Sequence, residues 1–321
     1  MTTLVGAPTA QQLEAAREVV KRYLRPTPSV ALTIRGREVY AKLDNLQVTG
    51  SFKLRGALAA LNAVRLEDPS IGVITSSAGN HGLGISHASS LLGVKATVVV
   101  PTNASAVKVA KISRYDVELI QFGNSYDEAQ AHARELSETR GLRFVSPFNN
   151  PNVVAGQATA FDEFLDSFPD VEHVVVSVGG GGWISGVLVS RAANNREDIT
   201  ITGVQPENSA AMADFVNGKD PEKTVHSPTI ADGLAGGVDP GSITNDIILS
   251  SGVKVLTIPE ASIRNAVREA VEQNGLVMEG SSAASYALIA EQLTQDHSKI
   301  GFLVSGRNIA FELLQEILTK G

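Results

Sequence analysis

The sequence predicts an α/β protein built on parallel sheets. Short β-branched runs alternate with longer Ala-, Leu- and Glu-rich stretches of helical periodicity, which is the pattern of βαβ units covered by helices on both faces. The strand-like runs lie at 72–75, 96–100, 117–121, 173–178, 199–205, 253–258 and 301–304. The helix-like stretches lie at 10–23, 51–66, 81–92, 126–140, 151–168, 262–274 and 282–293.

Loop chemistry divides this series into two domains. The units from about residue 72 to 145 form one set, which ends at the turn-rich segment Ser-Pro-Phe-Asn-Asn-Pro at 146–151. A second series then runs to the C-terminus. We therefore expect a large domain made of 1–71 and 147–321, and a small domain at 72–146.

The composition of the 321 residues excludes several classes of function. The absence of cysteine excludes disulfides, thiolate metal sites and a cysteine nucleophile. A formal charge of -7 and an aromatic share of 5% do not fit a basic surface for nucleic acid. No apolar run approaches the ~18 residues of a membrane helix, and the first nine residues lack a secretory pattern. We expect a cytoplasmic protein that binds neither nucleic acid nor membrane.

Four successive glycines follow the strand-like run at 173–178. Gly179, Gly180, Gly181 and Gly182 precede a helix-like stretch, and without Cβ atoms their backbone N–H groups can converge on an anion at the helix N-terminus. The turn matches neither the G-x-G-x-x-G dinucleotide pattern nor the Gly-Lys-Ser/Thr ending of a nucleotide-triphosphate loop. We expect it to bind a phosphate; a tight structural turn is the alternative.

Lys53 is the candidate for covalent chemistry. It lies in the first turn of the helix predicted at 51–66, with Ser51 as a possible N-cap. The positive end of the helix dipole disfavours a merely solvated cation there. A lysine whose pKa is lowered by such surroundings can form a Schiff base with a carbonyl. The alternative for Lys53 alone is an ordinary surface lysine.

Polar turns follow three further apolar runs. The segment from Ser77 to His81 leads into a predicted helix, where a hydroxyl, an amide and exposed N–H groups suit a carboxylate. An ordinary helix cap is the alternative. Glu279 and Ser305 lie at two later turns, at the edge of a parallel sheet where ligands bind.

In this order and spacing, the motifs resemble the fold-type II pyridoxal-phosphate enzymes, in the branch of threonine/serine dehydratases and serine racemases. The resemblance rests on Ser-Phe-Lys-x-Arg-Gly-Ala around Lys53, Ser-Ala-Gly-Asn-His, the tetraglycine turn, Glu279-Gly, and Ser-Gly-x-Asn from Ser305. It covers residues 17 to 318 approximately. It implies two parallel-sheet domains like those of the tryptophan synthase β chain, with pyridoxal 5′-phosphate in the cleft between them.

The resemblance also implies a role for each matched residue. Lys53 would hold the cofactor as a Schiff base, with Phe52 packed near its ring. Asn80 would bond the 3′-oxygen, Ser305 would face the pyridine nitrogen, and Glu279 would lie near that end of the ring. The phosphate would be cradled by Gly179, Gly180, Gly181 and Gly182. The substrate carboxylate would be received by Ser77, Ala78, Gly79, Asn80 and His81.

The activity implied by this resemblance is the dehydration and deamination of a β-hydroxy amino acid, L-threonine or L-serine, to a 2-oxo acid and ammonia. Lys53 would remove the Cα proton as general base. The neutral hydroxyl of Ser305 leaves the ring a weaker electron sink than a carboxylate partner would, which favours loss of a β-leaving group. Ala78 stands where racemases of this branch carry a second serine, which favours dehydration over racemisation.

Four alternatives stay open for the function. The same scaffold supports racemisation and β-replacement, and it supports dehydration of hydroxyaspartate, phenylserine or a larger hydroxy amino acid. From a different class, the protein would be a non-catalytic module that binds a phosphorylated metabolite, with Lys53 only a counter-ion.

Four further expectations follow from the resemblance. Gln205 and Ala211 stand where metal-activated members carry acidic residues, so no activating metal is expected. Arg307 replaces the family's usual glycine and is expected to point to solvent rather than to a second acidic group of the substrate. We expect a homodimer or homotetramer. The chain length leaves no room for the regulatory domain of feedback-inhibited relatives, so a catabolic role is expected.

Overall fold

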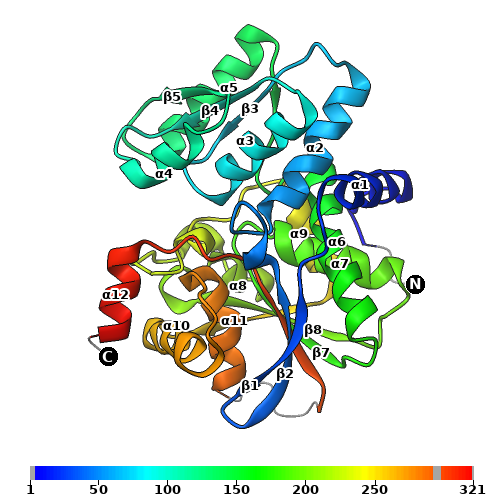
Figure 1. The fold of residues 1–321 in the computed structure, drawn as a ribbon, viewed down its shortest axis with the longest axis vertical. Helices are drawn as coiled ribbons and strands as arrows, with labels where there is room; N and C mark the ends of the chain where they lie inside the picture. Colours follow the sequence, from blue (N-terminus) through cyan, green and yellow to red (C-terminus); the bar gives the residue numbers. More distant parts are fainter. Residues whose placement is uncertain (1–3, 292–297, 320–321) are drawn as a thin grey trace. The chain divides into compact units, whose positions relative to one another are not determined.

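The computed structural model describes residues 4–291 and 298–319. The chain divides into two compact units. The first is made of Met1–Ala7, Pro26–Phe52 and Ala160–Gly321, and the second of Pro8–Arg25 and Lys53–Thr159. Each unit contains one sheet of mainly parallel strands with helices beside it, so the predicted α/β class is confirmed (Figure 1). The expected domain boundaries at 71/72 and 146/147 stay a prediction.

The first unit, the six-stranded unit, has the strand order β1-β2-β10-β7-β8-β9. Its neighbours pair in parallel except for β1 and β2, which form an antiparallel hairpin. The middle strands β10 and β7 are buried along their whole length, as expected for β-branched runs at the centre of a parallel sheet. The strands are β1 Ser29–Ile34, β2 Arg37–Leu43, β7 His173–Ser177, β8 Thr200–Pro206, β9 Lys254–Ile258 and β10 Ile300–Val304.

The helices of the six-stranded unit include one that is buried on all sides. Helix α11 (Gly280–Ala290) is rich in Ala and Ser, and these small side chains let it pack closely on β7, β10 and helix α10. Its Tyr286 meets Phe302 of β10 edge to face, with ring centroids 6.0 Å apart. The other helices are α7 Gly182–Ala193, α8 Ala211–Val216, α9 Ile243–Ser251, α10 Glu260–Asn274 and α12 Phe311–Thr319, while α6 Pro151–Ser167 passes from one unit into the other.

The second unit, the four-stranded unit, has the fully parallel order β5-β4-β3-β6. Helices α2 and α3 pack closely because Gly84 of α3 has no side chain: a Cβ atom there would lie 3.2 Å from the carbonyl oxygen of Lys53. The strands are β3 Val73–Ser76, β4 Ala96–Val100, β5 Glu118–Gln121 and β6 Arg143–Phe144. The helices are α1 Ala10–Tyr23, α2 Lys53–Glu67, α3 Asn80–Leu92, α4 Ala106–Ile112 and α5 Tyr126–Arg140.

All seven predicted strands are confirmed, with no end shifted by more than one residue. The helix predicted at 282–293 begins at Gly280, and its last two residues lie outside the described chain. The expected N-cap role of Ser51 is wrong. Ser51 instead takes part in an isolated bridge with Gly306, its hydroxyl has no hydrogen-bond partner among the described residues, and helix α2 begins at Lys53.

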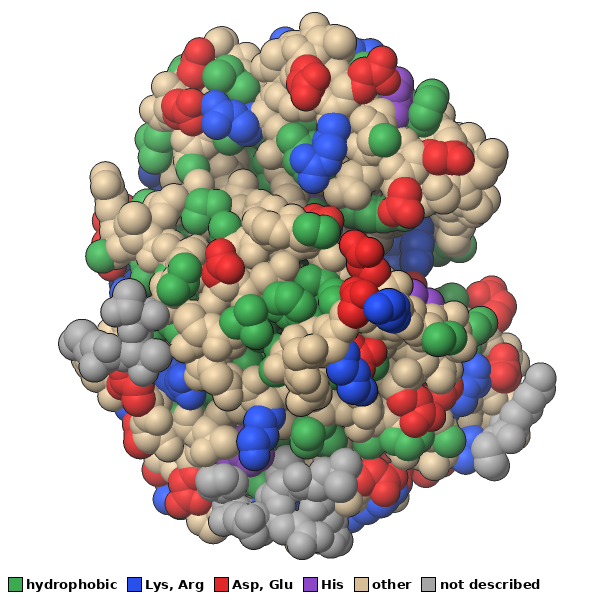
Figure 2. Space-filling view, turned by 180° about the vertical axis from the view of Figure 1, so that it is seen from behind, with side chains coloured by type: hydrophobic (Ala, Val, Ile, Leu, Met, Phe, Trp, Pro, Cys, Tyr) green, Lys and Arg blue, Asp and Glu red, His purple; other side chains and the backbone are tan. Residues whose placement is uncertain are grey.

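Basic and acidic side chains are interspersed on the face drawn in Figure 2. Within residues 4–291 and 298–319, no helix combines the length and the apolar character needed to cross a membrane.

Candidate active site

In the six-stranded unit, two predicted segments lie at the point where the strand order reverses. From β7 the chain proceeds outward through β8 and β9, whereas β10 lies on the opposite side of β7. In open α/β sheets, ligands bind beyond the carboxyl ends of the strands at such a switch point. The glycine turn at 179–182 follows β7 and Ser305 follows β10, so the topology brings both to neighbouring strand ends.

The four-stranded unit has a switch point of the same kind. From β3 the chain proceeds outward through β4 and β5, whereas β6 lies on the opposite side of β3. The segment Ser77–His81 follows β3, and the segment Val145–Pro147 follows β6. The carboxylate-binding candidates therefore also lie where a parallel sheet places a ligand.

The glycine turn is held in a conformation that excludes side chains. Gly181 has φ +85° and is the N-cap of α7, and a Cβ atom on it would lie 2.8 Å from Cδ1 of Ile248. A Cβ on Gly179 would lie 2.9 Å from the carbonyl oxygen of Gly233. The hydroxyl of Thr244 donates to the carbonyl oxygen of Gly180 at 2.8 Å, which fixes the turn from outside.

The N-terminus of α7 offers hydrogen-bond donors to an anion. The first N–H groups of a helix have no acceptor inside the helix, and the dipole adds positive potential there. The indole N–H of Trp183 and the hydroxyl of Ser185 are buried in the first turns of α7, without a partner among the described residues. Gly181 provides no side-chain cap. These features fit the phosphate cradle that the sequence predicts.

Ser305 and Glu279 meet in one corner of the six-stranded unit. Both side chains are nearly buried. The backbone N–H of Glu279 donates to the carbonyl oxygen of Gly306 at 3.0 Å, and its Oε2 accepts from the backbone N–H of Asn308 at 2.9 Å. The lack of a side chain at Gly306 leaves room for the carboxylate, because a Cβ there would lie 2.6 Å from Oε1 of Glu279. Arg307, which lies between Gly306 and Asn308 in the chain, is exposed, as expected.

Phe52 is joined to the same corner through its backbone. Its N–H donates to the carbonyl oxygen of Ser305 at 2.9 Å, and its ring packs on the indole of Trp183 with centroids 4.0 Å apart. Trp183 is a contact that the sequence analysis missed. The chain passes from one unit to the other directly after Phe52, so Lys53 belongs to the four-stranded unit.

Lys53 is the first residue of α2, half-buried, and its amine is held by the backbone. Nζ donates to the carbonyl oxygen of Pro147 at 3.1 Å. Pro147 follows β6 at the switch point, so this contact brings Lys53 to the sheet edge occupied by the segment Ser77–His81. No sequence motif indicated that Pro147 would orient the amine.

His81 is neutral in this arrangement. Its Nε2 lies 3.1 Å from the carbonyl oxygen of Val145, which can only accept, so Nε2 carries the proton. Burial, then the charge of Lys53, lowers the pKa of His81 to about 3, against the opposing effect of the Val145 hydrogen bond. The unprotonated Nδ1 cannot donate to a carboxylate. The donor that His81 can offer to a substrate is therefore its backbone N–H in the first turn of α3.

The N-terminus of α3 fits a carboxylate better than an ordinary cap. Gly79 is the N-cap and provides no side-chain oxygen to the first turn. The Ser77 hydroxyl accepts from the N–H of Gly79 at 3.2 Å. Gly82 brings the helix directly onto this turn, because a Cβ there would lie 2.0 Å from the carbonyl oxygen of Ser77. Ala78 places only a methyl group in the turn.

A family model for pyridoxal-phosphate dependent enzymes matches residues 20–306. The chain belongs to this family. Its cofactor is therefore pyridoxal phosphate, and the residues present fit that group: one lysine amine oriented by a backbone carbonyl, and a glycine turn at a helix N-terminus that side chains would fill.

The relatives in the family are named for two kinds of activity, ammonia-lyase and racemase. The L-threonine ammonia-lyase of Thermotoga maritima is 37% identical over 321 residues, which is 100% of this chain and 79% of the relative. The serine racemase of Dictyostelium discoideum is 32% identical over 97% of this chain and 98% of its own. The crystal structure of a pyridoxal 5′-phosphate-dependent aspartate racemase superimposes with a TM-score of 0.87 at 30% identity, covering 96% and 98% of the two chains.

The structure gives Gln205 a role that needs no metal. Its Oε1 accepts from the backbone N–H of Ala213 at 2.9 Å, so the buried amide supports the first turn of α8. Within the part of the chain that is described, no three His, Asp or Glu side chains gather in a way that could hold a metal ion.

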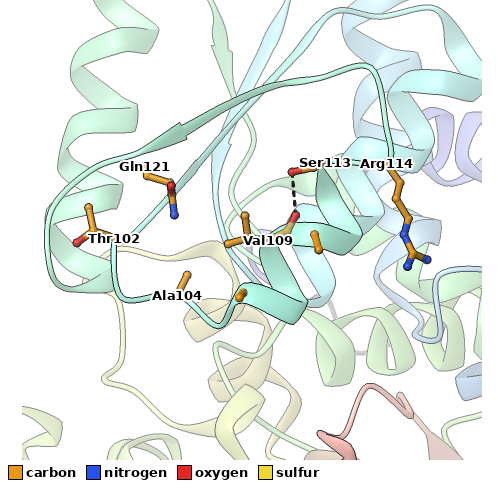
Figure 3. A pocket seen from close by; sticks show the side chains of 8 residues that line it. Thr102, Ala104, Val109, Ser113, Arg114 and Gln121 are labelled. Carbon is orange, nitrogen blue, oxygen red and sulfur yellow. Dashed lines mark hydrogen bonds between the residues drawn. The ribbon is translucent and has the colours of Figure 1, made fainter.

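A cavity of about 580 Å³ lies elsewhere in the four-stranded unit, beside α4 (Figure 3). None of the predicted site residues lines it. Its walls come from the exposed helix α4 and from the segments that follow β4 and precede α5, so it is separate from the switch point at β3 and β6. The lining residues are Thr102, Ala104, Ala106, Val109, Ala110, Ser113, Arg114 and Gln121.

Proposed function

We propose that the protein catalyses the pyridoxal-phosphate-dependent dehydration and deamination of L-threonine and L-serine to the 2-oxo acid and ammonia. The observation that carries the proposal is Lys53, whose amine is held by the carbonyl of Pro147 beside the donor-rich N-terminus of α3. The threonine ammonia-lyase at 37% identity and the catabolic L-threonine dehydratase of Escherichia coli K12 at 35% support the same reaction.

Each residue of the chain has a defined task in this proposal. The bound cofactor supplies the electron sink. The Lys53 amine would hold the cofactor through its carbonyl carbon and, once the substrate amine has taken its place there, would accept the Cα proton of the substrate. The backbone N–H groups of Asn80 and His81 hold the substrate carboxylate, with Ser77 beside them. The glycine turn holds the phosphate, so that binding is shared between many backbone donors.

Two features favour elimination over racemisation. Ala78 has no proton to exchange with the substrate. In the proposal, Lys53 is therefore the one side chain that transfers a proton to or from Cα. His81 is neutral, and its ring N–H already donates to the carbonyl oxygen of Val145. The names of the serine and aspartate racemases nevertheless make racemisation the second candidate function.

The test of the reaction is a substrate panel. L-threonine, L-serine, 3-hydroxyaspartate and phenylserine are incubated with the purified protein, and 2-oxo acids and both enantiomers of each amino acid are measured by chiral chromatography. We expect 2-oxobutyrate from L-threonine. Accumulation of the D-amino acid without a 2-oxo acid would establish the racemase instead.

The test of the covalent role is borohydride reduction followed by peptide mass analysis. We expect the cofactor on the Lys53 peptide, and loss of both trapping and activity in Lys53→Ala. The matched control is Lys95→Ala, because Lys95 is an exposed lysine of the same unit. If Lys53→Ala kept full activity, the role of Lys53 would be refuted. A wild type with neither a trapped Lys53 peptide nor activity would instead favour the non-catalytic phosphorylated-metabolite module.

The proposal extends to assembly and location. The family resemblance supports a homodimer or homotetramer acting on a small amino acid in the cytoplasm. Sedimentation of the purified protein measures the first of these, and a monomer at micromolar concentration would contradict it.

A further inference from the structure

We propose that the side chain of Trp183 belongs to the phosphate cradle, and that its indole N–H donates a hydrogen bond to an oxygen of the bound phosphate monoester. In the sequence, only the backbone of the glycine turn at 179–182 indicates such a cradle. The inference rests on the proposed function through one feature, the phosphate group of the cofactor. It adds a side-chain donor to the backbone donors of the turn.

The indole of Trp183 carries a buried donor that lacks an acceptor. The residue is 4% exposed, and Nε1 has no hydrogen-bond partner among the residues that the structure describes. An indole nitrogen can only donate. A donor that is buried without an acceptor is costly, and in a folded protein such a group indicates that a water molecule or a ligand binds there.

The ring of Phe52 fixes the indole without accepting its proton. The two ring centroids lie 4.0 Å apart, and the ring planes are tilted by 34°. The indole N–H lies in the plane of its ring, so a ring packed on the indole face at this tilt is not its acceptor. Phe52 is itself buried, and its backbone N–H donates to the carbonyl oxygen of Ser305 at 2.9 Å. Rotation of the indole toward another acceptor would therefore break this packing.

The position of Trp183 in α7 places its side chain beside the glycine turn. Trp183 is the second residue of the helix, directly after the four glycines. Helical side chains lean toward the N-terminus of their helix and cover the turn that precedes their own Cα. For Trp183 this is the turn in which Gly181 is the N-cap and provides no side-chain cap. Because the glycines carry no Cβ atoms, a large ring can lie next to their backbone N–H groups.

A phosphate monoester matches this donor chemically. Its three terminal oxygens are strong acceptors. Hydrogen bonds to an ionised acceptor are stronger than those between neutral groups, and a buried site with a low dielectric constant strengthens them further. In the cofactor-free protein a water molecule can accept from the indole instead, and binding of the phosphate would displace it.

The experiment reads the indole proton directly by NMR, because the chain contains one tryptophan. The cofactor-free protein, labelled with ¹⁵N-tryptophan and ¹⁵N-glycine, is titrated separately with inorganic phosphate, pyridoxal phosphate and pyridoxal, which lacks the phosphate. A hydrogen bond to an anion moves the donor proton downfield. We expect inorganic phosphate and pyridoxal phosphate to move the indole proton downfield together with the amide protons of Gly179 to Gly182. Pyridoxal should not cause this shift.

Trp183→Phe keeps an aromatic ring against Phe52 and removes the donor. We expect its affinity for inorganic phosphate and for pyridoxal phosphate to fall about tenfold, as for the loss of a hydrogen bond to a charged group. Its affinity for pyridoxal should be unchanged, whereas a general disturbance of the fold would weaken the binding of all three probes. The titration of the wild type does not depend on whether this variant folds.

The matched control is Tyr40→Phe, which removes a donor from another stacked ring of the same unit. Tyr40 packs on Phe168 with ring centroids 4.0 Å apart and planes tilted by 4°. In the sheet Tyr40 pairs with Gly301, near the amino end of β10. The glycine turn instead follows the carboxyl end of β7. We expect this control to bind inorganic phosphate as tightly as the wild type.

Two results would overturn the inference alone. Phosphate could move the glycine amide signals and leave the indole signal in place, or Trp183→Phe could bind phosphate as tightly as the wild type. If neither the glycine nor the indole signals responded to phosphate or to pyridoxal phosphate, the cradle itself would be refuted, and the role of Trp183 with it. Failure of the proposed reaction looks different: the indole would still respond to phosphate, but no Lys53 peptide would be trapped and no 2-oxo acid would form.

Discussion

Gly181 shows how one residue can be required twice, by its backbone angle and by its neighbours. Its φ of +85° is unfavourable for any side chain, and a Cβ would also lie 2.9 Å from Cβ of Thr244. We expect Gly181→Ala to lower the free energy of unfolding by about 2–4 kcal/mol, from about 1–2 for the left-handed angle and the rest for overpacking. Affinity for inorganic phosphate should fall as well.

Gly252→Ala is the control for this substitution. Gly252 belongs to the same unit and has φ +66°, but nothing lies within 4 Å of its added Cβ. Comparing the free energies of unfolding of the two variants in urea separates the cost of the backbone angle from the cost of steric crowding. Equal losses would contradict the view that the glycine turn is shaped by its contacts with Thr244 and Ile248.

His81 makes stability depend on pH. Its folded pKa of about 3 lies below the ordinary value of 6.5, so the unfolded chain binds a proton that the folded chain does not. The stabilising contribution of neutral His81 is complete above pH 6.5 and is lost as pH falls toward 3, by up to about 1.4 kcal/mol per pH unit.

The measurement is urea unfolding of wild type and His81→Gln between pH 5 and pH 7. The contributions of the other titrating groups to the free energy of unfolding cancel in the difference between the two proteins. We expect the wild type to lose stability faster toward pH 5, because glutamine takes up no proton in the unfolded state. Parallel pH curves would show that His81 is protonated in the folded protein.

Individual residues of the candidate site could be predicted where a short motif at a strand end exposes backbone N–H groups or small polar side chains. Gly179 to Gly182, Ser77 to His81 and Ser305 stand at strand ends, and the alternation of strands and helices already places strand ends together. The partners of these residues were not predictable. Pro147 contacts Lys53, Trp183 contacts Phe52 and Ser282 contacts Ser305, each from a distant segment of the chain, and a single sequence carries no signal for such pairs.

At the scale of elements, seven strands were predictable because each is a short apolar run rich in β-branched residues, whereas β6, which has only two residues, was missed. The hairpin of β1 and β2 was missed. Its turn is Arg35-Gly36, with φ of +46° and +80°, and the sequence lacks the Asn-Gly or Asp-Gly pair that usually marks such a turn. Strand β1 is also half-exposed at the edge of the sheet, so its pattern is weak.

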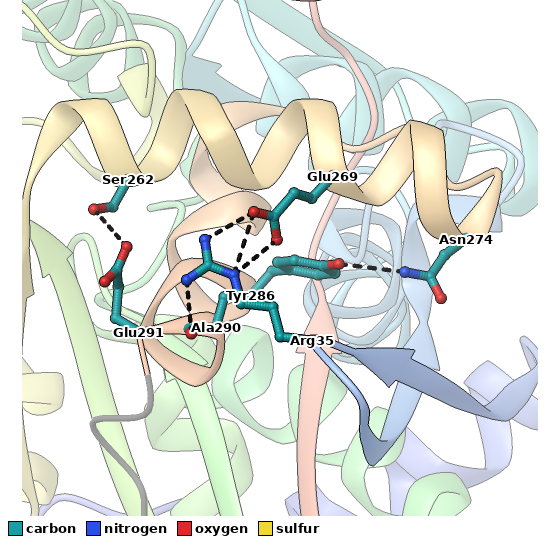
Figure 4. A network of polar contacts seen from close by, with 7 residues as sticks. All are labelled: Arg35, Ser262, Glu269, Asn274, Tyr286, Ala290 and Glu291. Atoms are coloured by element: carbon teal, nitrogen blue, oxygen red, sulfur yellow. Dashed lines mark hydrogen bonds and ion pairs between the residues drawn. The ribbon is translucent and has the colours of Figure 1, made fainter.

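Tertiary contacts stabilise that unusual turn. The guanidinium of Arg35 donates to both oxygens of Glu269 on α10 and to the carbonyl oxygen of Ala290 at the end of α11 (Figure 4). Tyr286 lies beside this network, and its burial, followed by the charge of Glu269, raises its pKa to about 12. An arginine at positive φ is therefore supported by partners that lie 234 and 255 residues further along the chain, which no local pattern reveals.

A buried lysine joins strand β2 to helix α6. Lys42 has 0% exposure, and its Nζ lies 2.6 Å from Oε2 of Glu163 and 2.5 Å from the carbonyl oxygen of Thr27. We expect Lys42→Met to lower the free energy of unfolding by about 3–5 kcal/mol, because it leaves the carboxylate without its cation. Lys42→Met combined with Glu163→Gln should recover part of this loss in urea unfolding. A double variant as unstable as the sum of the two single variants would contradict the pairing.

Helix α8 leads to a prediction about metal dependence. The Gln205 amide already supports the first turn of α8, and a neutral amide is a poor ligand for a hard cation beside Ala211. We expect activity to be unchanged after treatment with EDTA and after addition of Mg²⁺ or Ca²⁺. A loss of rate in EDTA that Mg²⁺ restores would contradict this expectation and would indicate a cation site built from other ligands.

At the scale of the whole molecule, the two switch points divide the chemistry between two compact units. The glycine turn and Ser305 belong to the six-stranded unit, whereas Lys53 and the segment Ser77–His81 belong to the four-stranded unit. The alternation of elements predicted two sheets, but it could not assign residues near 52 and 160 to one unit or the other, because the chain passes between the units inside continuous segments there.

If one cofactor is bound by residues of both units, its binding should slow amide hydrogen exchange in both units. Adding pyridoxal phosphate to the cofactor-free protein is expected to slow amide exchange in the peptides that contain Lys53 and Gly179–Ile184, since a ligand at 100 times its Kd adds about 2.7 kcal/mol of protection. Inorganic phosphate, which has no carbonyl, should protect the glycine peptide only. Pyridoxal without its phosphate should protect the Lys53 peptide only. Protection confined to one unit by the complete cofactor would show that Lys53 and the glycine turn serve different ligands.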